Sequence, residues 1–298
     1  MHIQIPERFT RETMYGLLSR TIDNDLQPIS NEIHFDFRNL RFIEPTGITI
    51  LSNLFEWLLV RNVEANIIYP EEFGREKYCP IKYLDDSMFF AEYLGGEPLS
   101  EFSHVRPTTL PLQKVSYSSS FQWLQNVFVT WLAGRLYVTR ESVDGFRVCL
   151  DEIFNNINDH AAEDTGCIFV QQYPRNNEIQ IAISDFGVGI PHNVKNSHNP
   201  FLNDAEALYQ AAQKGFSTKS TPKNRGVGLD NLITSAVLNN KGTVHIHSNN
   251  GILKCTNVNN KVEFTPKLAQ GFYPGTLIEI TLRTDNIENI TEEEFSWD

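Results

Sequence analysis

The sequence predicts an α/β protein built from two units, and three observations lead to this expectation. Within the first third, short alternating runs typical of strands surround one apolar run with helical spacing. From about residue 116 onward, helix-spaced segments and alternating runs follow one another around glycine-rich turns. Between these parts, residues 106–111 hold two prolines and two threonines that interrupt both patterns. We therefore expect a domain at 1–105, a linker at 106–115, a second domain at 116–285 and an acidic tail at 286–298, which is either a flexible end or a docking peptide.

The first domain follows the order strand, turn, helix, strand. Residues 33–37 alternate like a strand, and residues 41–43 begin a second short apolar run. The tetrapeptide 44–47 then predicts a turn before a helix over 48–60, and a further strand is expected at 65–68. Because strands joined through a helix usually pair in parallel, this order indicates a βαβ arrangement.

Over about residues 28–95, this order resembles a STAS domain, the fold of anti-anti-sigma factors. In the phosphorylated members of that family, an Asp-Ser-Ser/Thr-Gly turn carries the target hydroxyl. Here Glu44 replaces the aspartate and Pro45 takes the usual target position, so Thr46 is the only hydroxyl of the turn. The departure argues against phosphorylation of this turn, and a small α/β scaffold without a switch is the alternative interpretation.

A helix bearing polar residues at four-residue intervals is the strongest feature of the second domain, after an opening helix expected at 121–136. Glu152, Asn156 and His160 share one stripe of this helix, since positions four apart on a helix nearly coincide in direction. A neighbouring apolar stripe would anchor the helix in a core: Phe146, Leu150, Ile153 and Ile157. Taken alone, the polar stripe fits a solvated helix face equally well, and His160 could simply satisfy the last carbonyl groups.

Glycine-centred motifs follow that helix in the chain. The first is Asp185-Phe186-Gly187-Val188-Gly189, directly after an alternating strand at 178–184, so its carboxylate stands at a strand end. The second, Asn224-Arg225-Gly226-Val227-Gly228-Leu229, precedes an apolar helical stretch at 229–238, where free backbone N–H groups favour an anion. The third, Pro274-Gly275-Thr276, leads into an alternating strand at 277–282. Each motif alone is weak, because most such glycines serve only turns.

Together, in this order, the motifs of residues 116–285 resemble the GHKL ATPase superfamily, which includes type II topoisomerases, histidine kinases and anti-sigma-factor kinases. The similarity is greatest to the anti-sigma-factor serine kinases, whose first motif also pairs a glutamate with an asparagine four residues on. The resemblance implies a two-layer α/β sandwich with a mixed sheet. It also implies that ATP and Mg²⁺ are the cofactors.

The resemblance assigns a role to each motif residue. Asn156 would complete the coordination of Mg²⁺, Asp185 would accept a hydrogen bond from the adenine amino group, and Glu152 would be the general base. Gly187 and Gly189 would line the base, with Thr276 supporting that region. The phosphates would meet the backbone N–H groups of Gly226, Gly228 and Leu229. In this superfamily the segment 191–224 is a lid over ATP, which makes Lys219, Lys223 and Arg225 candidate phosphate contacts, although ordinary surface charge explains them equally well.

Bulk composition restricts the remaining possibilities. A net charge of −12 disfavours a large nucleic-acid footprint, because phosphate backbones need clustered positive charge. The four cysteines have neither metal-ligand spacing nor the density of a disulfide framework, which fits a reducing cytoplasm. The N-terminus lacks the pattern of an export signal, and the most apolar window, 42–60, is interrupted by charged residues and proline, so no membrane span is expected.

Two classes of function fit this sequence. One is an ATP-dependent enzyme, either an ATPase or a serine/threonine protein kinase of the partner-switching type. The other is a nucleotide-gated interaction module with little turnover, in which ATP orders the lid. The resemblance implies a STAS-domain or sigma-factor-like regulator as protein partner, together with a homodimer.

Overall fold

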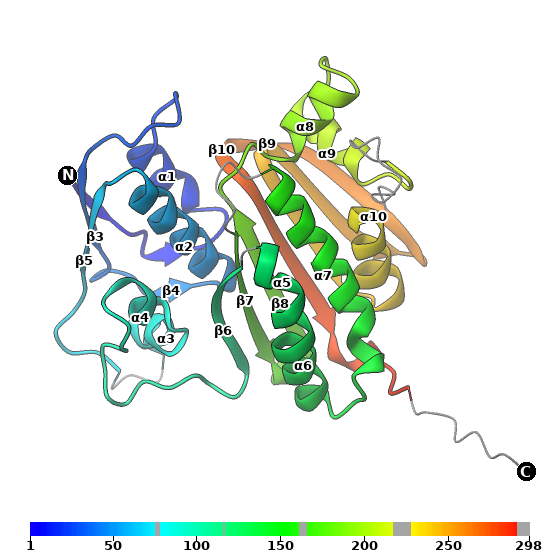
Figure 1. Cartoon of the computed structure of the whole chain (residues 1–298), viewed down its shortest axis with the longest axis horizontal. Helices are drawn as coiled ribbons and strands as arrows, with labels where there is room; N and C mark the ends of the chain where they lie inside the picture. Colours follow the sequence, from blue (N-terminus) through cyan, green and yellow to red (C-terminus); the bar gives the residue numbers. More distant parts are fainter. Residues whose placement is uncertain (75–77, 116, 161–165, 217–227, 291–298) are drawn as a thin grey trace, which may run out of the picture.

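The structure is a computed structural model that describes residues 1–74, 78–115, 117–160, 166–216 and 228–290, with the backbone alone at 117–119 and 155–160. It contains a parallel N-terminal sheet and a larger C-terminal sheet, each with its own helices (Figure 1). The predicted α/β class is confirmed.

The N-terminal unit is built on a parallel three-stranded sheet in the order β1-β3-β5. Its strands are β1 (His2–Gln4), β3 (Glu32–Asp36) and β5 (Glu64–Ile68), and both ladders are parallel, which confirms the predicted βαβ arrangement. A short parallel pair, β2 (Arg8–Phe9) with β4 (Phe42–Ile43), lies beside it. The helices of this unit are α1 (Met14–Thr21), α2 (Pro45–Val60), α3 (Pro80–Asp86) and α4 (Phe89–Tyr93).

Helix α2 begins earlier than the sequence pattern indicates. The expected turn at 44–47 is wrong, because Pro45 is the first helical residue and Glu44 is the N-cap. Proline suits this position, since its missing N–H would have no partner in the first turn and its fixed φ is already helical. Gly47 lies tightly packed here: a Cβ on it would approach Ile43 Cγ1 to 2.8 Å and Phe9 O to 3.1 Å.

The C-terminal sheet has five strands among the described residues, in the order β6-β7-β8-β10-β9. They are β6 (Thr109–Val115), β7 (Gly166–Tyr173), β8 (Glu178–Asp185), β9 (Thr243–Val258) and β10 (Lys261–Arg283). The described ladders of this sheet are antiparallel, so the expected mixed pairing is wrong for them. Tight connections explain the direction of two of them: β9 and β10 join through Asn259 and Asn260, both with positive φ, and β7 and β8 join through a short 3₁₀ turn.

Residues 109–115, expected in a linker, form the edge strand β6 of this sheet. Pro111 is compatible with that place, because an edge strand tolerates a residue without an N–H group, and the ladder to β7 shifts register between Leu110 and Gln113. The chain therefore enters the C-terminal unit as a strand of its sheet.

Helices cover one face of this sheet (Figure 1). The expected opening helix is present as α5 (Tyr117–Trp123), a π-helical stretch (Leu124–Phe128) and α6 (Val129–Leu136), followed by α7 (Glu141–His160). After β8 come α8 (Ile190–Ser197), α9 (Asp204–Ala211) and α10 (Gly228–Ile233), which continues as a π-helical stretch (Thr234–Asn239). A final 3₁₀ turn, Thr284–Asn286, ends the described fold of the domain.

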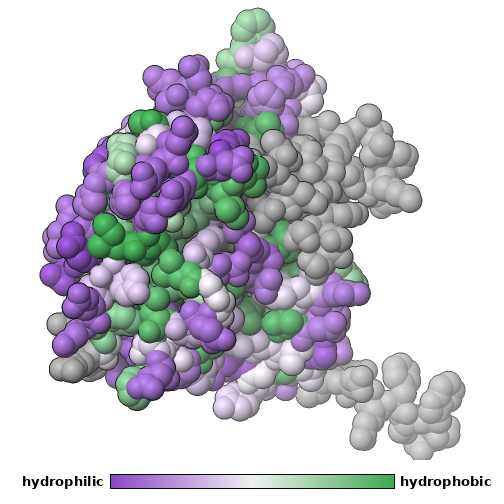
Figure 2. Space-filling view, turned by 60° about the vertical axis from the view of Figure 1, so that its left-hand side comes forward, coloured by the Kyte–Doolittle hydropathy of each residue, from purple (hydrophilic) through white to green (hydrophobic). Residues whose placement is uncertain are grey.

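The N-terminal unit packs on the opposite face of the C-terminal sheet (Figure 1). Phe169, Phe186, Tyr273 and Leu277 of the C-terminal unit belong to the same apolar core as α2 and the N-terminal strands. A second core lies between the sheet and helices α6, α7 and α10. The sheet is therefore buried on both faces, and the outer surface seen in Figure 2 intersperses hydrophobic residues among hydrophilic ones.

Polar contacts between buried side chains hold the N-terminal unit against the C-terminal sheet. The side-chain amide of Asn53 on α2 donates to the hydroxyl of Ser184 on β8. The Cys167 thiol on β7 lies 3.3 Å from both the Thr49 carbonyl oxygen and Asn53 Oδ1. Nearer the edge, Lys114 Nζ lies 3.1 Å from a Glu56 carboxylate oxygen and 2.6 Å from one of Glu92.

Candidate functional site

Asp185 ends strand β8 and is 5% exposed. The alternating sequence of β8 places it at the strand end, where its ladder partner on β10 is Thr276. Burial raises the pKa of Asp185 to about 7, although backbone N–H groups of Thr276 and Gly187 hydrogen-bond its carboxylate and oppose the rise. The result is a buried acid that changes charge near neutral pH.

The turn after Asp185 is held by two residues of strand β9, Ser248 and Asn249. Ser248 Oγ accepts a hydrogen bond from Ile190 N at 3.0 Å, and Asn249 Nδ2 donates to the Val188 carbonyl oxygen at 3.1 Å. A Cβ on Gly189 would come within 2.6 Å of Asn249 Oδ1 and 2.7 Å of Ser248 Oγ, and the φ of Gly189 is +82°. Glycine is therefore required at 189 by the fold itself.

Ser248 and Asn249 were not predicted as site residues from the sequence. The run Ser-Asn-Asn-Gly at 248–251 has the composition of a loop. Nothing in it distinguishes buried side chains that hydrogen-bond a neighbouring turn from an ordinary exposed turn. The one available signal is the alternation of valine, isoleucine and histidines just before it, which continues as a strand through these residues.

Gly275 places the motif at 274–276 in close contact with the motif that begins at Asp185. A Cβ on Gly275 would lie 2.2 Å from the Asp185 carbonyl oxygen and 2.6 Å from Gly187 N, and its φ is +129°. Ladder pairing sets Thr276, which is 8% exposed, opposite Asp185. The structure thus brings together four of the predicted positions: Asp185, Gly187, Gly189 and Thr276.

A second group joins helices α7 and α10. A Cβ on Gly228 would lie 2.9 Å from Glu152 Cβ and 3.3 Å from its Oε2, so the first residue of α10 packs directly on Glu152. The Glu152 side chain is exposed, and Leu229 packs in part against the core beneath it. The predicted acid therefore lies beside the helix start that was predicted to bind phosphate.

Several predicted residues lie outside the described residues: Lys219, Gly226, Lys223 and Arg225. Asn156 and His160 lie in the last part of α7, residues 155–160, where only the backbone is described. The structure therefore places Asn156 one helical turn after Glu152. Among the described residues, histidine, cysteine, aspartate and glutamate form no group of three suited to a metal. The predicted role of Asn156 toward Mg²⁺ stays a prediction.

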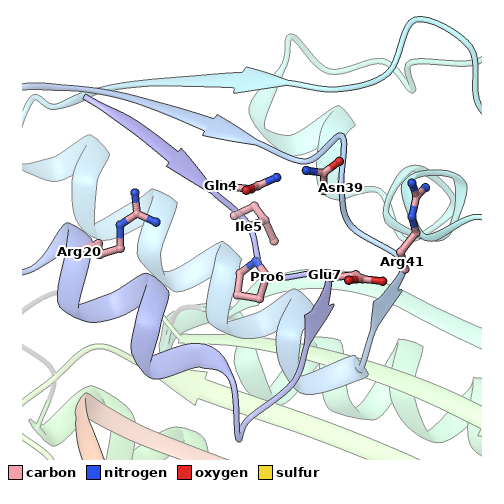
Figure 3. A pocket seen from close by; sticks show the side chains of 7 residues that line it. All are labelled: Gln4, Ile5, Pro6, Glu7, Arg20, Asn39 and Arg41. Carbon is pink, nitrogen blue, oxygen red and sulfur yellow. The ribbon is translucent and has the colours of Figure 1, made fainter.

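A separate hollow lies in the N-terminal unit, and Asp185 is not among its lining residues. It is lined by the end of β1 and the residues after it, by the chain around Asn39 and Arg41, and by Arg20 of α1 (Figure 3). None of its lining residues was predicted as a site residue: Gln4, Ile5, Pro6, Glu7, Arg20, Asn39 and Arg41. The predicted site residues lie instead around Asp185 and Glu152.

The C-terminal unit is similar to one family of known proteins. The family model described as histidine kinase-, DNA gyrase B- and HSP90-like ATPase matches residues 141–286, which include Asp185, Glu152 and Thr276. No curated protein matches the chain. Within the described part of the chain, no helix combines the length and apolarity needed to cross a membrane.

Proposed function

Residues 141–286 are a histidine kinase-, DNA gyrase B- and HSP90-like ATPase domain of the GHKL superfamily, and we propose that this domain binds ATP with Mg²⁺ as part of a regulatory protein. The observation that carries the proposal is Asp185, a buried carboxylate beside Gly189 and Gly275. Both glycines have positive φ and lie too close to neighbouring atoms for a side chain to fit. An amino group on a planar base is a ligand that such an acceptor recognises.

The phosphate end of the site is proposed at α7 and α10. The first N–H groups of α10, at Gly228 and Leu229, have no acceptor within their own helix and are therefore available to an anion. Asn156 offers an oxygen ligand, the type that Mg²⁺ prefers, from the same face of α7 as Glu152. When bound, the ion offsets the charge of the phosphates.

Glu152 is proposed as the general base. It lies on an exposed helix face beside Gly228, so it can accept a proton from a nucleophile that attacks a phosphate held at the start of α10. A water molecule makes the domain an ATPase, and a serine or threonine of a partner makes it a protein kinase. We propose the kinase of partner-switching type as the sharper hypothesis, because the motifs resemble those of anti-sigma-factor kinases, and the same resemblance supports a homodimer. The spacing of the cysteines supports a cytoplasmic location.

The proposed STAS-like unit does not offer its own hydroxyl in this arrangement. Thr46 is fully buried within the first turn of α2, which packs on β7 and β8. A kinase reaction would therefore use a hydroxyl of another protein, for which a STAS-domain or sigma-factor-like regulator is the proposed class.

One observation favours the nucleotide-gated module as a second candidate. Asn53 of α2 hydrogen-bonds Ser184, the residue directly before Asp185. A change at Asp185 on nucleotide binding would reach the N-terminal unit through a single buried contact.

Calorimetric titration with Mg-ATP tests the binding site. The Asp185→Asn variant should lose binding, because the amide presents N–H groups to the base, whereas Asp25→Asn changes the same chemistry at an exposed position and should bind as the unaltered protein does. Equal affinity of Asp185→Asn would contradict the site. Incubation with labelled ATP and purified STAS or sigma-factor proteins then separates the activities: label on a partner indicates a kinase, free phosphate indicates an ATPase, and binding without either indicates the gated module.

A further inference from the structure

Ser248 is a fully buried serine of β9 that contacts both sides of the proposed base-binding edge. Its Oγ accepts from Ile190 N at 3.0 Å, at the end of the glycine turn. It also donates to the Gly275 carbonyl oxygen at 2.6 Å and lies 3.1 Å from Thr276 Oγ1. None of these contacts was anticipated from the motifs.

Counting hydrogens fixes the direction of the bond between the two hydroxyls. A serine hydroxyl has one hydrogen and two lone pairs. The Gly275 carbonyl can only accept, so it takes that hydrogen, and Ile190 N–H occupies one lone pair. The contact with Thr276 therefore uses the second lone pair, and Thr276 is its donor.

As a consequence, Thr276 offers the site a hydrogen-bond acceptor and no donor. The only hydroxyl hydrogen of Thr276 is committed to Ser248, so its oxygen offers lone pairs alone to a ligand. The ladder partner of Thr276 is Asp185, whose ionised carboxylate also accepts only. Two neighbouring acceptors match a base edge that carries an exocyclic amino group and oppose one that carries a carbonyl oxygen.

We propose that Ser248 is a specificity-determining residue that holds Thr276 as a hydrogen-bond acceptor and thereby selects 6-amino over 6-oxo purine nucleotides. This inference rests on the proposed function, because it concerns the base bound at Asp185. Ser248 does not touch the base and acts through Thr276.

The test compares the dissociation constants of ATP and ITP, which differ by the amino and oxo groups, at pH 8, where Asp185 is ionised. The unaltered protein should favour ATP by about tenfold or more, since a carbonyl facing two buried acceptors leaves both unpaired. In Ser248→Ala, Thr276 is free to turn its hydrogen toward a carbonyl, so the preference should fall at least about threefold. Ser52→Ala is the matched control, because Ser52 is also fully buried and hydrogen-bonded, to Tyr93 Oη at 2.7 Å, but lies on α2. Its ATP preference should stay that of the unaltered protein.

The outcomes separate the two claims. If Ser248→Ala weakens ATP and ITP equally, Ser248 only supports the fold and the inference is overturned. The same holds if the unaltered protein binds both nucleotides equally well, which leaves ATP binding intact. Absence of any ATP binding by the unaltered protein overturns the proposed function itself.

A second variant serves if Ser248→Ala does not fold, as judged by circular dichroism. Ser248→Cys keeps a weaker donor and acceptor in the same place, so its ATP preference should fall between those of the unaltered protein and a protein lacking the hydroxyl. A folded Ser248→Cys protein with the full preference of the unaltered protein would contradict the proposal.

Discussion

Asp185 combines a strand end, burial and two backbone donors, and its pKa of about 7 follows from their balance. The same group titrates near 3.8 when unfolded, so it binds more protons in the folded state between these values. Its contribution to stability is therefore full below about pH 4 and is lost as the pH rises through 7. The ionised form that binds an amino group is thus obtained at a cost to folding, which is typical of functional groups.

ATP affinity should depend on pH through this group. Above pH 7 Asp185 is ionised and accepts the amino hydrogen, whereas below pH 7 the affinity should fall, approaching tenfold per pH unit. Calorimetric titrations from pH 6 to 8.5 would measure this. Asp25→Asn supplies the control profile, and a constant affinity of the unaltered protein across this range would show that Asp185 is not the acceptor.

Glu152→Ala should separate binding from turnover. Because Glu152 is exposed beside Gly228 and does not contact Asp185 in any described hydrogen bond, ATP affinity should be retained. Loss of the base should slow phosphate release or transfer about 10²-fold or more. Glu141→Ala, at the other end of α7, provides the control in the same assay, and unaltered turnover by Glu152→Ala would remove the proposed role.

Among the helices, α2 packs on both sheets, which its sequence pattern did not indicate. Its apolar residues point both to the N-terminal sheet and to β7 and β8, so burial extends around most of the helix. A helix buried all round belongs to a core, and here it joins two units.

Leu54→Ala should lower the free energy of unfolding by about 2–5 kcal/mol, because Leu54 is fully buried and truncation leaves a cavity. Leu59→Ala makes the same change on the same helix at a side chain that is 64% exposed, and should stay within about 0.5 kcal/mol of the unaltered protein. Urea denaturation followed by circular dichroism measures both, and equal losses would show that α2 is not anchored as described.

The elements with clear periodicity were predictable from the sequence. The strand at 178–184 and the helix bearing Glu152 lie where the pattern indicated, since hydrophobic repeat and burial agree there. Strand β6 was not, because Pro107 and Pro111 resemble a linker and only the sheet edge makes a proline acceptable in a strand. The residues Asp185, Gly187, Gly189 and Thr276 carry motif signals, whereas Ser248 acts through tertiary contacts that no local pattern records.

At the level of the whole molecule, one core includes side chains of both units. Phe169, Phe186, Tyr273 and Leu277 lie on the C-terminal sheet but pack with the N-terminal unit. Removal of residues 1–105 would expose these side chains to water. The two units are therefore interdependent in folding, although the sequence indicated a linker between them.

We expect the full chain to unfold in one calorimetric transition, with equal calorimetric and van't Hoff enthalpies. A truncated chain of residues 106–298 should aggregate or lose its near-ultraviolet circular dichroism, because its sheet face is uncovered. Two separate transitions in the full chain, together with a monodisperse and folded truncated chain, would contradict a shared core.

The contact of Asn53 with Ser184 and Cys167 also constrains how this protein can vary during evolution. The Asn53 side-chain amide hydrogen-bonds Ser184 on β8 and Cys167 on β7. A substitution at any of these three positions therefore removes a hydrogen bond from a buried polar partner. Among relatives these positions should change together. A chimera that takes its first hundred residues from a homologue would need the matching residues of β7 and β8 as well, so the N-terminal unit is inherited together with the sheet that it covers.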